Sequence, residues 1–338
     1  MKILVFGQIY PDSFAKNILV TLRAMGHEAR PIANPLLEFG DSISLMKLAI
    51  YAKRVVPQVE EWTYRGLLRE AREFRPDLVL IAGEQPPPAV VRKMKEHVNA
   101  PVVQWFMDAL SNLGRQYILA ADYDAYFFKD AYVVRFFRQK LMKRSYLLDE
   151  ACNPMWHRRV DLTEEEQARY KCELTVAANL YWYRALMLEP FLDYDLKVWG
   201  NYIPRWLESP VRDRYQNHYV AEHEKAKALN AAKIVMNTMH YAEIEGFNAR
   251  LFETAGCGAF QIIDWRADLQ RCFEPEQEVV TFQTMEDLKE KVRYYLEHEK
   301  ERREIADRAY WRAHREHTYE HRLKRLLKLT FDGEADER

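Results

Sequence analysis

Two glutamates in the C-terminal half of the chain flank the start of a predicted helix, where their side chains could bind a polar ligand. Glu245 and Glu253 are separated by seven residues, with a turn at Gly246 and a helical pattern over 248–255. The start of a helix exposes unpaired backbone N–H groups and a positive dipole end, which suit a pyrophosphate. Glu253, one turn after Arg250, is free in this pattern to accept hydrogen bonds from ribose hydroxyls. Glu245 would face the sugar. The segment predicts a nucleotide-sugar site.

The elements that must position these glutamates alternate between strand and helix. Apolar runs predict strands at 3–6, 28–33, 77–82, 101–106 and 126–128, with helical patterns at 14–25, 45–74, 90–97 and 131–141 between them. After a pause near 153–166, further strands are expected at 174–177, 196–199, 234–236, 260–263 and 279–282, followed by amphipathic helices over 285–329. This alternation is typical of parallel sheets.

The predicted fold is therefore α/β, with two Rossmann-like doubly wound domains facing a cleft. The first domain is placed at 1–160 and the nucleotide-sugar domain at 161–310. The helix at 311–330 is expected to cross back, so that the C-terminal helices pack toward the first domain.

The composition excludes several classes of function. The 338 residues are 48% hydrophobic and 30% charged, which indicates a globular chain. Lys and Arg total 50 against 51 for Asp and Glu, so no net field favours nucleic acid. The four cysteines show no C-x-x-C spacing and are expected to be packed thiols. The apolar run at the N-terminus is too short for a signal peptide and no run is long enough to span a membrane, so a cytoplasmic location is expected.

Several segments together resemble one family, the retaining GT-B glycosyltransferases with two glutamates separated by seven residues, and specifically their CgeB-like, spore-maturation branch. The segments that carry the resemblance are Gly246-Phe247-Asn248-Ala249-Arg250-Leu251-Phe252-Glu253, Gly256-Cys257-Gly258, Phe273-Glu274-Pro275, His317-Thr318-Tyr319-Glu320-His321-Arg322 and, more loosely, Gln104-Trp105-Phe106-Met107-Asp108. The resemblance covers most of the chain, unevenly. It implies transfer of a sugar from a nucleoside diphosphate sugar with retention of configuration.

The resemblance also implies roles on the donor side, in the second domain. Glu253 would hold the ribose, and Glu245 would contact the sugar or stabilise the charge that develops as the glycosidic bond breaks. Arg184 would neutralise the leaving pyrophosphate. Related enzymes commonly have a basic pair near that position, whereas Arg184 stands alone among aromatic residues. The other donor-side residues expected are Gly246, Phe247 and Asn248 at the phosphates or sugar, Arg250 on the same helix, Gly200, Asn201 and Tyr202 beside the base, and His240 and Tyr241 near the sugar.

The acceptor is expected to enter from the first domain. Asp108, beyond the strand at 101–106, is the catalytic candidate on that side, although Asp is also a frequent helix cap. Gly7, Gln8 and Ser13, in the first strand-to-helix turn, would line the same side. The acceptor itself is unidentified and could be a glycan, a protein or a small molecule.

Neither a cofactor nor a metal is expected beyond the donor substrate, for which a UDP-sugar is favoured. Asp122-Tyr123-Asp124 and Asp193-Tyr194-Asp195 spell the D-x-D pattern that holds a metal in other glycosyltransferases. Both precede apolar strands, where paired aspartates commonly make turns. A helix dipole and an arginine can supply the charge that a metal would otherwise supply.

Other interpretations stay open at this stage. Glu253 could be a solvated helix residue paired with Arg250 or a neighbouring lysine, and Arg184 could form a surface or interdomain salt bridge. The chain could also be a nucleotide-sugar epimerase, which would need an acid/base pair acting on the sugar, or a noncatalytic carbohydrate-binding or assembly protein.

Overall fold

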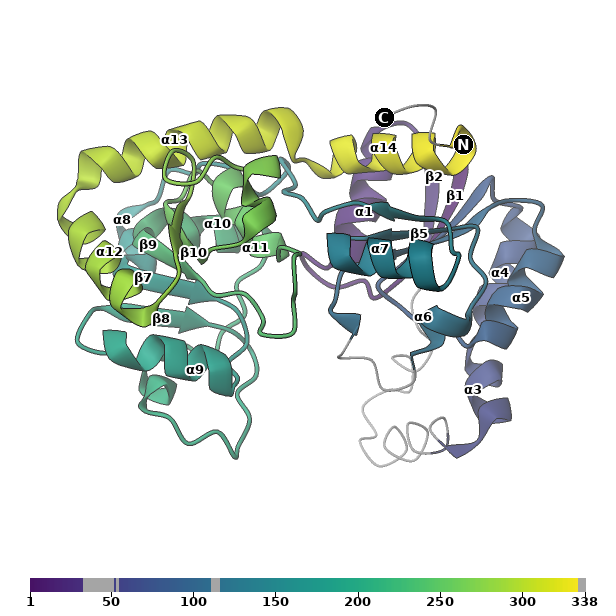
Figure 1. The fold of residues 1–338 in the computed structure, drawn as a ribbon, viewed down its shortest axis with the longest axis horizontal. Coiled ribbons are helices and arrows are strands. Elements are labelled where there is room, and N and C mark those ends of the chain that lie inside the picture. The colour runs from purple at the N-terminus through teal and green to yellow at the C-terminus, as the bar shows by residue number, and fades with distance from the viewer. Residues whose placement is uncertain (33–51, 53–54, 111–115, 334–338) are drawn as a thin grey trace. The chain divides into compact units, whose positions relative to one another are not determined.

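The chain forms two compact units. The computed structural model describes residues 1–32, 52, 55–110 and 116–333. Unit 1 comprises Met1–Asp149 and Tyr319–Arg338, and unit 2 comprises Glu150–Thr318. Each unit is built on one parallel sheet with helices packed on it (Figure 1). The first part of the helical segment expected at 45–74 lies outside the described residues.

The sheet of unit 1 has six strands in the order β2-β1-β3-β4-β5-β6, all paired in parallel. The strands are β1 (Lys2–Phe6), β2 (Glu28–Ile32), β3 (Leu78–Ala82), β4 (Val102–Phe106), β5 (Ala125–Phe128) and β6 (Ser145–Leu147). The helices are α1 (Phe14–Ala24), α3 (Pro57–Thr63), α4 (Arg65–Phe74), α5 (Pro88–His97), α6 (Tyr117–Ala120), α7 (Ala131–Lys140) and α14 (Tyr319–Phe331).

The sheet of unit 2 has five strands in the order β11-β10-β9-β7-β8, again all parallel. The strands are β7 (Cys172–Ala177), β8 (Leu196–Trp199), β9 (Ala232–Asn237), β10 (Gln261–Asp264) and β11 (Val280–Phe282). The helices are α8 (Glu164–Tyr170), α9 (Trp182–Leu188), η3 (Glu189–Phe191), η4 (Pro210–Arg214), α10 (Glu222–Ala231), α11 (Ala249–Gly256), η5 (Ala267–Arg271), α12 (Met285–Glu297) and α13 (Glu299–Glu316).

Both sheets share one topology, in which the first strand of the unit lies between the second and the third. The chain therefore reverses its direction of travel across the sheet between β1 and β3 in unit 1, and between β7 and β9 in unit 2. Loops that leave such a pair of strands diverge, and the crevice beyond their carboxyl ends is where ligands of doubly wound sheets bind. The topology thus marks one candidate site in each unit.

The local sequence explains why these elements form. Central strands such as β3 and β4 are buried along their whole length, as expected for parallel strands covered on both faces. Side-chain caps begin several helices: Ser13 caps α1, Asp130 caps α7 and Asn248 caps α11. The predicted fold class is confirmed. The strand that sequence reasoning missed is β6, whose three residues are too few to show a periodicity.

The units divide at other residues than the sequence suggested. The prediction ended the first domain at 160, whereas the units divide after Asp149. The reason is that the following segment packs on unit 2: Cys152 N–H donates to the His317 carbonyl at 3.0 Å, and Arg159 forms an ion pair with Asp307. At the other end, α14 packs against α1 within unit 1.

The four cysteines are buried and free of disulfides, which confirms that they are packed thiols. Within the described ranges, no helix is both long enough and apolar enough to cross a bilayer.

Candidate functional site

Helix α11 carries the predicted donor motif, and its N-terminus is fixed by Asn248. The Asn248 side chain accepts a hydrogen bond from Leu251 N–H at 3.2 Å, which is a standard helix cap. Phe247, Leu251 and Phe252 are fully buried in the core of unit 2. The side chain of Phe247 therefore cannot reach a ligand, and this segment has only its backbone to offer a phosphate or a sugar. Gly246 is buried and Glu245 is half-buried in the loop ahead of the helix.

Arg184 lies on α9, directly beyond β7 at the switch point of unit 2. Its side chain is 4% exposed. Its Nε donates to Thr238 Oγ1 at 3.3 Å, Nη2 donates to the Tyr181 hydroxyl at 3.3 Å, and Nη1 donates to the Asn179 carbonyl. The guanidinium also lies 4.4 Å from the centre of the Tyr181 ring. Arg184 is held rigidly, through neutral groups alone.

Arg250 reaches the same point from α11. Its Nη2 donates to the Thr238 carbonyl at 2.9 Å, and its Nε donates to Asn237 Oδ1 at 3.3 Å. Thr238 follows β9, the strand next to β7. Its hydroxyl oxygen accepts from Arg184 and its carbonyl oxygen accepts from Arg250, so this one residue joins the two arginines. The basic partner that Arg184 lacked in the sequence is therefore Arg250, which lies 66 residues further along the chain.

A buried amide network orients Arg250. Asn237 Oδ1 accepts from both Arg250 Nε and Asn248 Nδ2, the latter at 3.0 Å. Asn237 Nδ2 in turn donates to Gln261 Oε1 at 3.0 Å, and Gln261 Nε2 donates to the Leu251 carbonyl at 2.9 Å. Because these amides are satisfied by one another, the network fixes the direction of the Arg250 side chain relative to α11.

In the described part of the protein, neither guanidinium group forms an ion pair with a carboxylate, and Glu243 acts on Arg184 only through a weaker charge interaction. Burial, and next the like charge of Arg250, lower the pKa of Arg184 to about 9, against smaller opposing effects of Tyr181 and Glu243. Arg184 still carries its charge at neutral pH. The pair is thus a preorganised positive centre suited to an anion. Among the described residues, Arg184 does not form the salt bridge that was considered from the sequence.

Aromatic side chains surround this positive centre. The His240 ring stacks on Tyr241, with ring centres 4.4 Å apart, and Tyr181 lies 5.3 Å from His240. Tyr241 is 72% exposed, so its outer face is open to a ligand. Tyr183 packs edge-on against Tyr241, and burial raises its pKa to about 12. His240 Nδ1 accepts from Ala242 N–H at 3.1 Å, which leaves the proton of the neutral ring on Nε2.

The expected base-side loop is rigid. Tyr215 accepts from Tyr202 N–H at 2.9 Å and donates to the Tyr202 carbonyl at 2.8 Å. A Cβ at Gly200 would lie 2.3 Å from the Tyr215 hydroxyl oxygen, so only glycine fits there. Asn201 is exposed and the Tyr202 ring is 59% exposed, which leaves both side chains open to a ligand.

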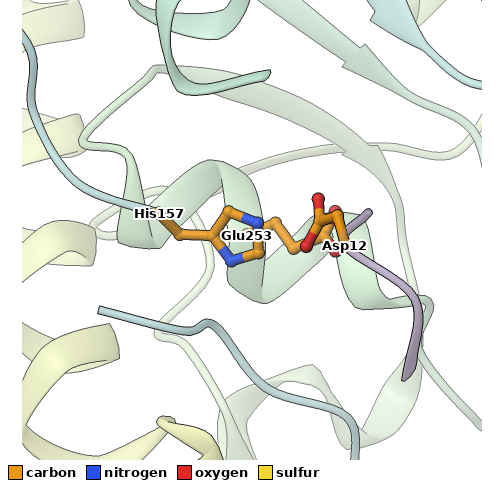
Figure 2. Close-up of side chains that lie close together, drawn as sticks. All are labelled: Asp12, His157 and Glu253. Atoms are coloured by element: carbon orange, nitrogen blue, oxygen red, sulfur yellow. The ribbon is translucent and has the colours of Figure 1, made fainter. Parts of the chain in front are cut away.

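Glu253 differs from the sequence expectation, because it is not free on the helix surface. It is 5% exposed, and its Oε2 accepts from Lys225 Nζ of α10 at 3.0 Å. A ring nitrogen of His157 lies within 4.8 Å of a Glu253 carboxylate oxygen, and Figure 2 shows the His157 ring beside the Glu253 side chain. The alternative of a lysine partner is correct, but the pair is buried rather than solvated, since the two side chains are only 9% and 7% exposed.

In unit 1, the residues after β1 lie at the switch point of that sheet. A Cβ at Gly7 would lie 2.6 Å from Ala15 Cβ and 2.7 Å from the Ala82 carbonyl oxygen, so glycine is required by the packing of α1 against the sheet. Gln8 is exposed beside it.

The other two candidates of unit 1 have structural contacts. Ser13 Oγ accepts from Lys16 N–H at 3.2 Å as the cap of α1, and the residue is 3% exposed. Asp108, exposed beyond β4, accepts from Ala109 N–H at 2.8 Å. Asp108 thus has a turn-forming contact and still presents its side chain to solvent, whereas the hydroxyl of Ser13 is committed to the helix.

The first D-x-D segment is a charged turn. Lys95 Nζ lies 2.9 Å from Asp124 and 3.5 Å from Asp122, and Lys143 lies 3.1 Å from Asp122. These lysines already neutralise the aspartates.

Of the predicted donor residues, the structure brings Arg184, Arg250, His240 and Tyr241 to one place and gives Glu253 a separate, buried setting on the next turn of α11. Sequence reasoning missed three contributors: Thr238, Asn237 and Lys225. Asn237 and Thr238 directly follow the strand predicted at 234–236, and polar residues at that place are a signal that could have been used. Nothing in the sequence marks Lys225 as part of the site, because its pairing with Glu253 depends on how α10 and α11 are placed in the fold.

Comparison with known proteins places this site in a family context. Residues 184–328 match the family described as glycosyl transferase-like. The spore protein CgeB of Bacillus subtilis is 29% identical over 121 residues, a match that covers 32% of this chain and 37% of that relative.

Solved structures are similar over nearly the whole chain. Sucrose-phosphate synthase of Thermosynechococcus elongatus has a TM-score of 0.70 at 11% identity, covering 97% of this chain and 98% of its own. A glycosyltransferase of Rickettsia africae scores 0.68 at 12% identity and covers 99% of both chains. Anabaena HepE in complex with UDP-glucose scores 0.66 at 12% identity and covers 97% of this chain and 99% of its own. At such identities the similarity establishes the fold alone, which is GT-B. With the family match, it confirms the resemblance to the CgeB-like GT-B branch.

Proposed function

We propose that this chain is a glycosyltransferase that binds a nucleoside diphosphate sugar in unit 2 and moves the sugar to an acceptor with retention of configuration. The observation that carries the proposal is the pair of guanidinium groups on Thr238. Arg184 is buried and Arg250 lies beside it, and neither has a carboxylate partner in the described structure. A diphosphate supplies the missing negative charge, and its oxygens suit guanidinium donors.

The position of the pair supports the same ligand. Arg184 follows β7 and Arg250 follows β9, the two strands between which the chain reverses across the sheet of unit 2. Mononucleotides bind at such switch points, with phosphates at a helix N-terminus. Glu245 lies ahead of that helix, where it would contact the sugar. The exposed Tyr202 on its rigid loop would border the base. UDP is the nucleotide we favour, because the structurally similar HepE was solved with UDP-glucose.

The proposed transfer needs no side chain of the protein to act as a base, because every bond change and the proton are accounted for by the two substrates. The acceptor hydroxyl oxygen forms a bond to the anomeric carbon as the bond from that carbon to the diphosphate breaks, on the same face of the sugar. The diphosphate oxygen takes the acceptor proton. Arg184 and Arg250 would stabilise the charge on the departing diphosphate, and Glu245 would stabilise the positive charge that develops on the sugar. Two fixed guanidinium groups can do this without a metal, and we propose a metal-independent reaction.

Incubating the purified chain with a panel of nucleotide-sugars tests this proposal. Free nucleotide that appears only when an acceptor is added supports transfer. An isomerised donor would instead identify an epimerase, and no reaction with any donor would favour a noncatalytic binding protein. In parallel, UDP, GDP, ADP and dTDP are compared by thermal shift. A ligand at one hundred times its Kd adds about 2.7 kcal/mol, or about 5 to 10 °C for units of this size. If no nucleotide stabilises the chain, the donor site is refuted.

A further inference from the structure

The carboxylate of Glu253 is held by residues that no sequence motif connects to it. Lys225 Nζ donates to Glu253 Oε2 at 3.0 Å, and the two side chains are 9% and 7% exposed. Lys225 belongs to α10 and Glu253 to α11, so the pair joins two helices of unit 2. In the described structure, Lys225 is the hydrogen-bond partner found for this carboxylate, and it occupies one of the two oxygens. The second oxygen remains able to accept.

His157 lies near the same carboxylate. The ring is fully buried, and its Nδ1 accepts from Asn153 N–H at 3.0 Å. That bond leaves the proton of the neutral ring on Nε2. A ring nitrogen of His157 lies within 4.8 Å of a Glu253 oxygen (Figure 2). Glu253 therefore has a lysine on one side and an imidazole on another.

Stability alone is a weak reason for such a pair. Removing two charges from water costs several kcal/mol for each ion, and an apolar pair of similar volume is often as stable. What the hydrogen bond from Lys225 does provide is a carboxylate held in one position. Glu253 also lies one turn after Arg250, which contacts the proposed diphosphate site. A ribose attached to that diphosphate would therefore lie near the next turn of α11, which carries Glu253.

We infer that Lys225 positions Glu253 for the ribose of the nucleotide and makes the site selective for ribose over 2′-deoxyribose. This inference rests on the proposed function, because it takes the nucleotide to bind in unit 2. A carboxylate fixed in this way accepts from a ribose hydroxyl, and a ligand that lacks the hydroxyl leaves the buried charge without that donor. Sites built to bind a hydroxyl discriminate strongly against analogues without it. Lys225 acts through Glu253 and is a positioning residue.

The experiment compares ribonucleotides with their deoxy counterparts. The probes are UDP, GDP and ADP, each paired with dUDP, dGDP or dADP, and the readout is the ratio of the two dissociation constants by calorimetry. Wild-type chain is expected to favour the ribonucleotide by at least about tenfold. Lys225→Met should bring the ratio close to one, and Lys225→Arg should restore part of the preference. A purely structural role would lower the affinity for both members of a pair equally.

Lys227 provides the matched control on the same helix. Its Nζ lies 2.5 Å from Glu166, and its side chain is 33% exposed. Lys227→Met removes an ion pair from α10 without touching Glu253, so it should keep the wild-type ratio.

Lys225→Met leaves Glu253 charged and buried, and this variant could fail to fold. The double variant Lys225→Met/Glu253→Gln removes both charges and avoids that problem. It should bind ribonucleotide and deoxynucleotide equally. A wild-type preference that persists in either variant overturns the inference while leaving the proposed function intact. If the wild-type chain binds none of the probes, the proposed function fails, and the inference fails with it.

Discussion

Replacing Arg184 by methionine should leave the stability of the free chain nearly unchanged and abolish its response to nucleotide. Burial, and then Arg250, lower the pKa of Arg184 from its usual range to about 9. At about 1.4 kcal/mol per pH unit this shift corresponds to about 5 kcal/mol. Because the folded pKa lies below the unfolded one, the charge opposes folding fully below pH 9, and the cost fades as the pH rises toward the pKa of a free guanidinium group.

The hydrogen bonds of Arg184 offset this cost. Two of its three bonds are 3.3 Å long, and bonds of this kind contribute about 1 to 1.5 kcal/mol each. A methionine of similar length removes both the cost and the bonds. The expected change in the free energy of unfolding is therefore within about 2 kcal/mol of zero, in contrast to the usual loss of about 3 to 5 kcal/mol when one partner of a buried ion pair is removed.

Arg302 supplies the control for this prediction. It is 7% exposed, and its Nη1 donates to the Tyr295 and Leu296 carbonyls, the latter at 3.1 Å. Those carbonyls lie at the C-terminal end of α12, where they have no partner within the helix. Arg302→Met should therefore lower the stability by about 1 to 3 kcal/mol and keep the response to nucleotide.

Thermal denaturation with and without saturating UDP measures both effects on the two variants. The anion-site reasoning is refuted if Arg184→Met loses more than about 3 kcal/mol and still shows the wild-type shift with UDP. That result would make Arg184 a structural residue like Arg302.

Three further predictions follow from the same site. Glu253→Ala should weaken nucleotide binding, whereas Glu245→Ala should spare it and lower turnover; equal losses of affinity, measured by calorimetry, would refute this division of roles. Asn237→Asp would place a carboxylate where an amide oxygen now accepts from Arg250 Nε at 3.3 Å, so it should weaken the binding of diphosphate by about tenfold or more and spare the nucleoside. Chelation with EDTA should leave the transfer rate unchanged, and activity that disappears and returns with a divalent cation would show that the reaction needs a metal.

The parts of the site that sequence reasoning anticipated depend on local interactions. Helix α11 was expected over 248–255 and is formed by Ala249–Gly256, with Asn248 as its cap. Its cap, its apolar spacing and the glycines that follow are all encoded within a dozen residues. The strands are likewise encoded locally, because their continuous apolar runs indicate burial on both faces of the sheet. Local patterns of this kind survive folding, because tertiary packing reinforces them.

The parts that were missed depend on strand order. Arg184 and Arg250 meet only because β9 pairs with β7 rather than with β8, and no periodicity in the sequence specifies that order. The exposure of Glu253 was also misjudged. Helical spacing places it away from Leu251 and Phe252, which suggests solvent, but Lys225 of α10 reaches its carboxylate and the residue is buried. Helical periodicity distinguishes the faces of one helix, and it does not tell what packs on the second face.

The burial of charge in unit 2 separates a ligand site from ordinary structure. Two other buried cations of unit 2 differ from the arginine pair: Lys225 has the Glu253 carboxylate, and Arg302 binds the carbonyls at the end of a helix. Arg184 and Arg250 are two like charges held side by side, and burial together with the charge of Arg250 lowers the pKa of Arg184, which works against folding. A bound diphosphate would reverse the sign of that effect, because each guanidinium would then have a counter-ion within the low-dielectric site. The free energy of unfolding of this unit should therefore rise when a nucleotide binds.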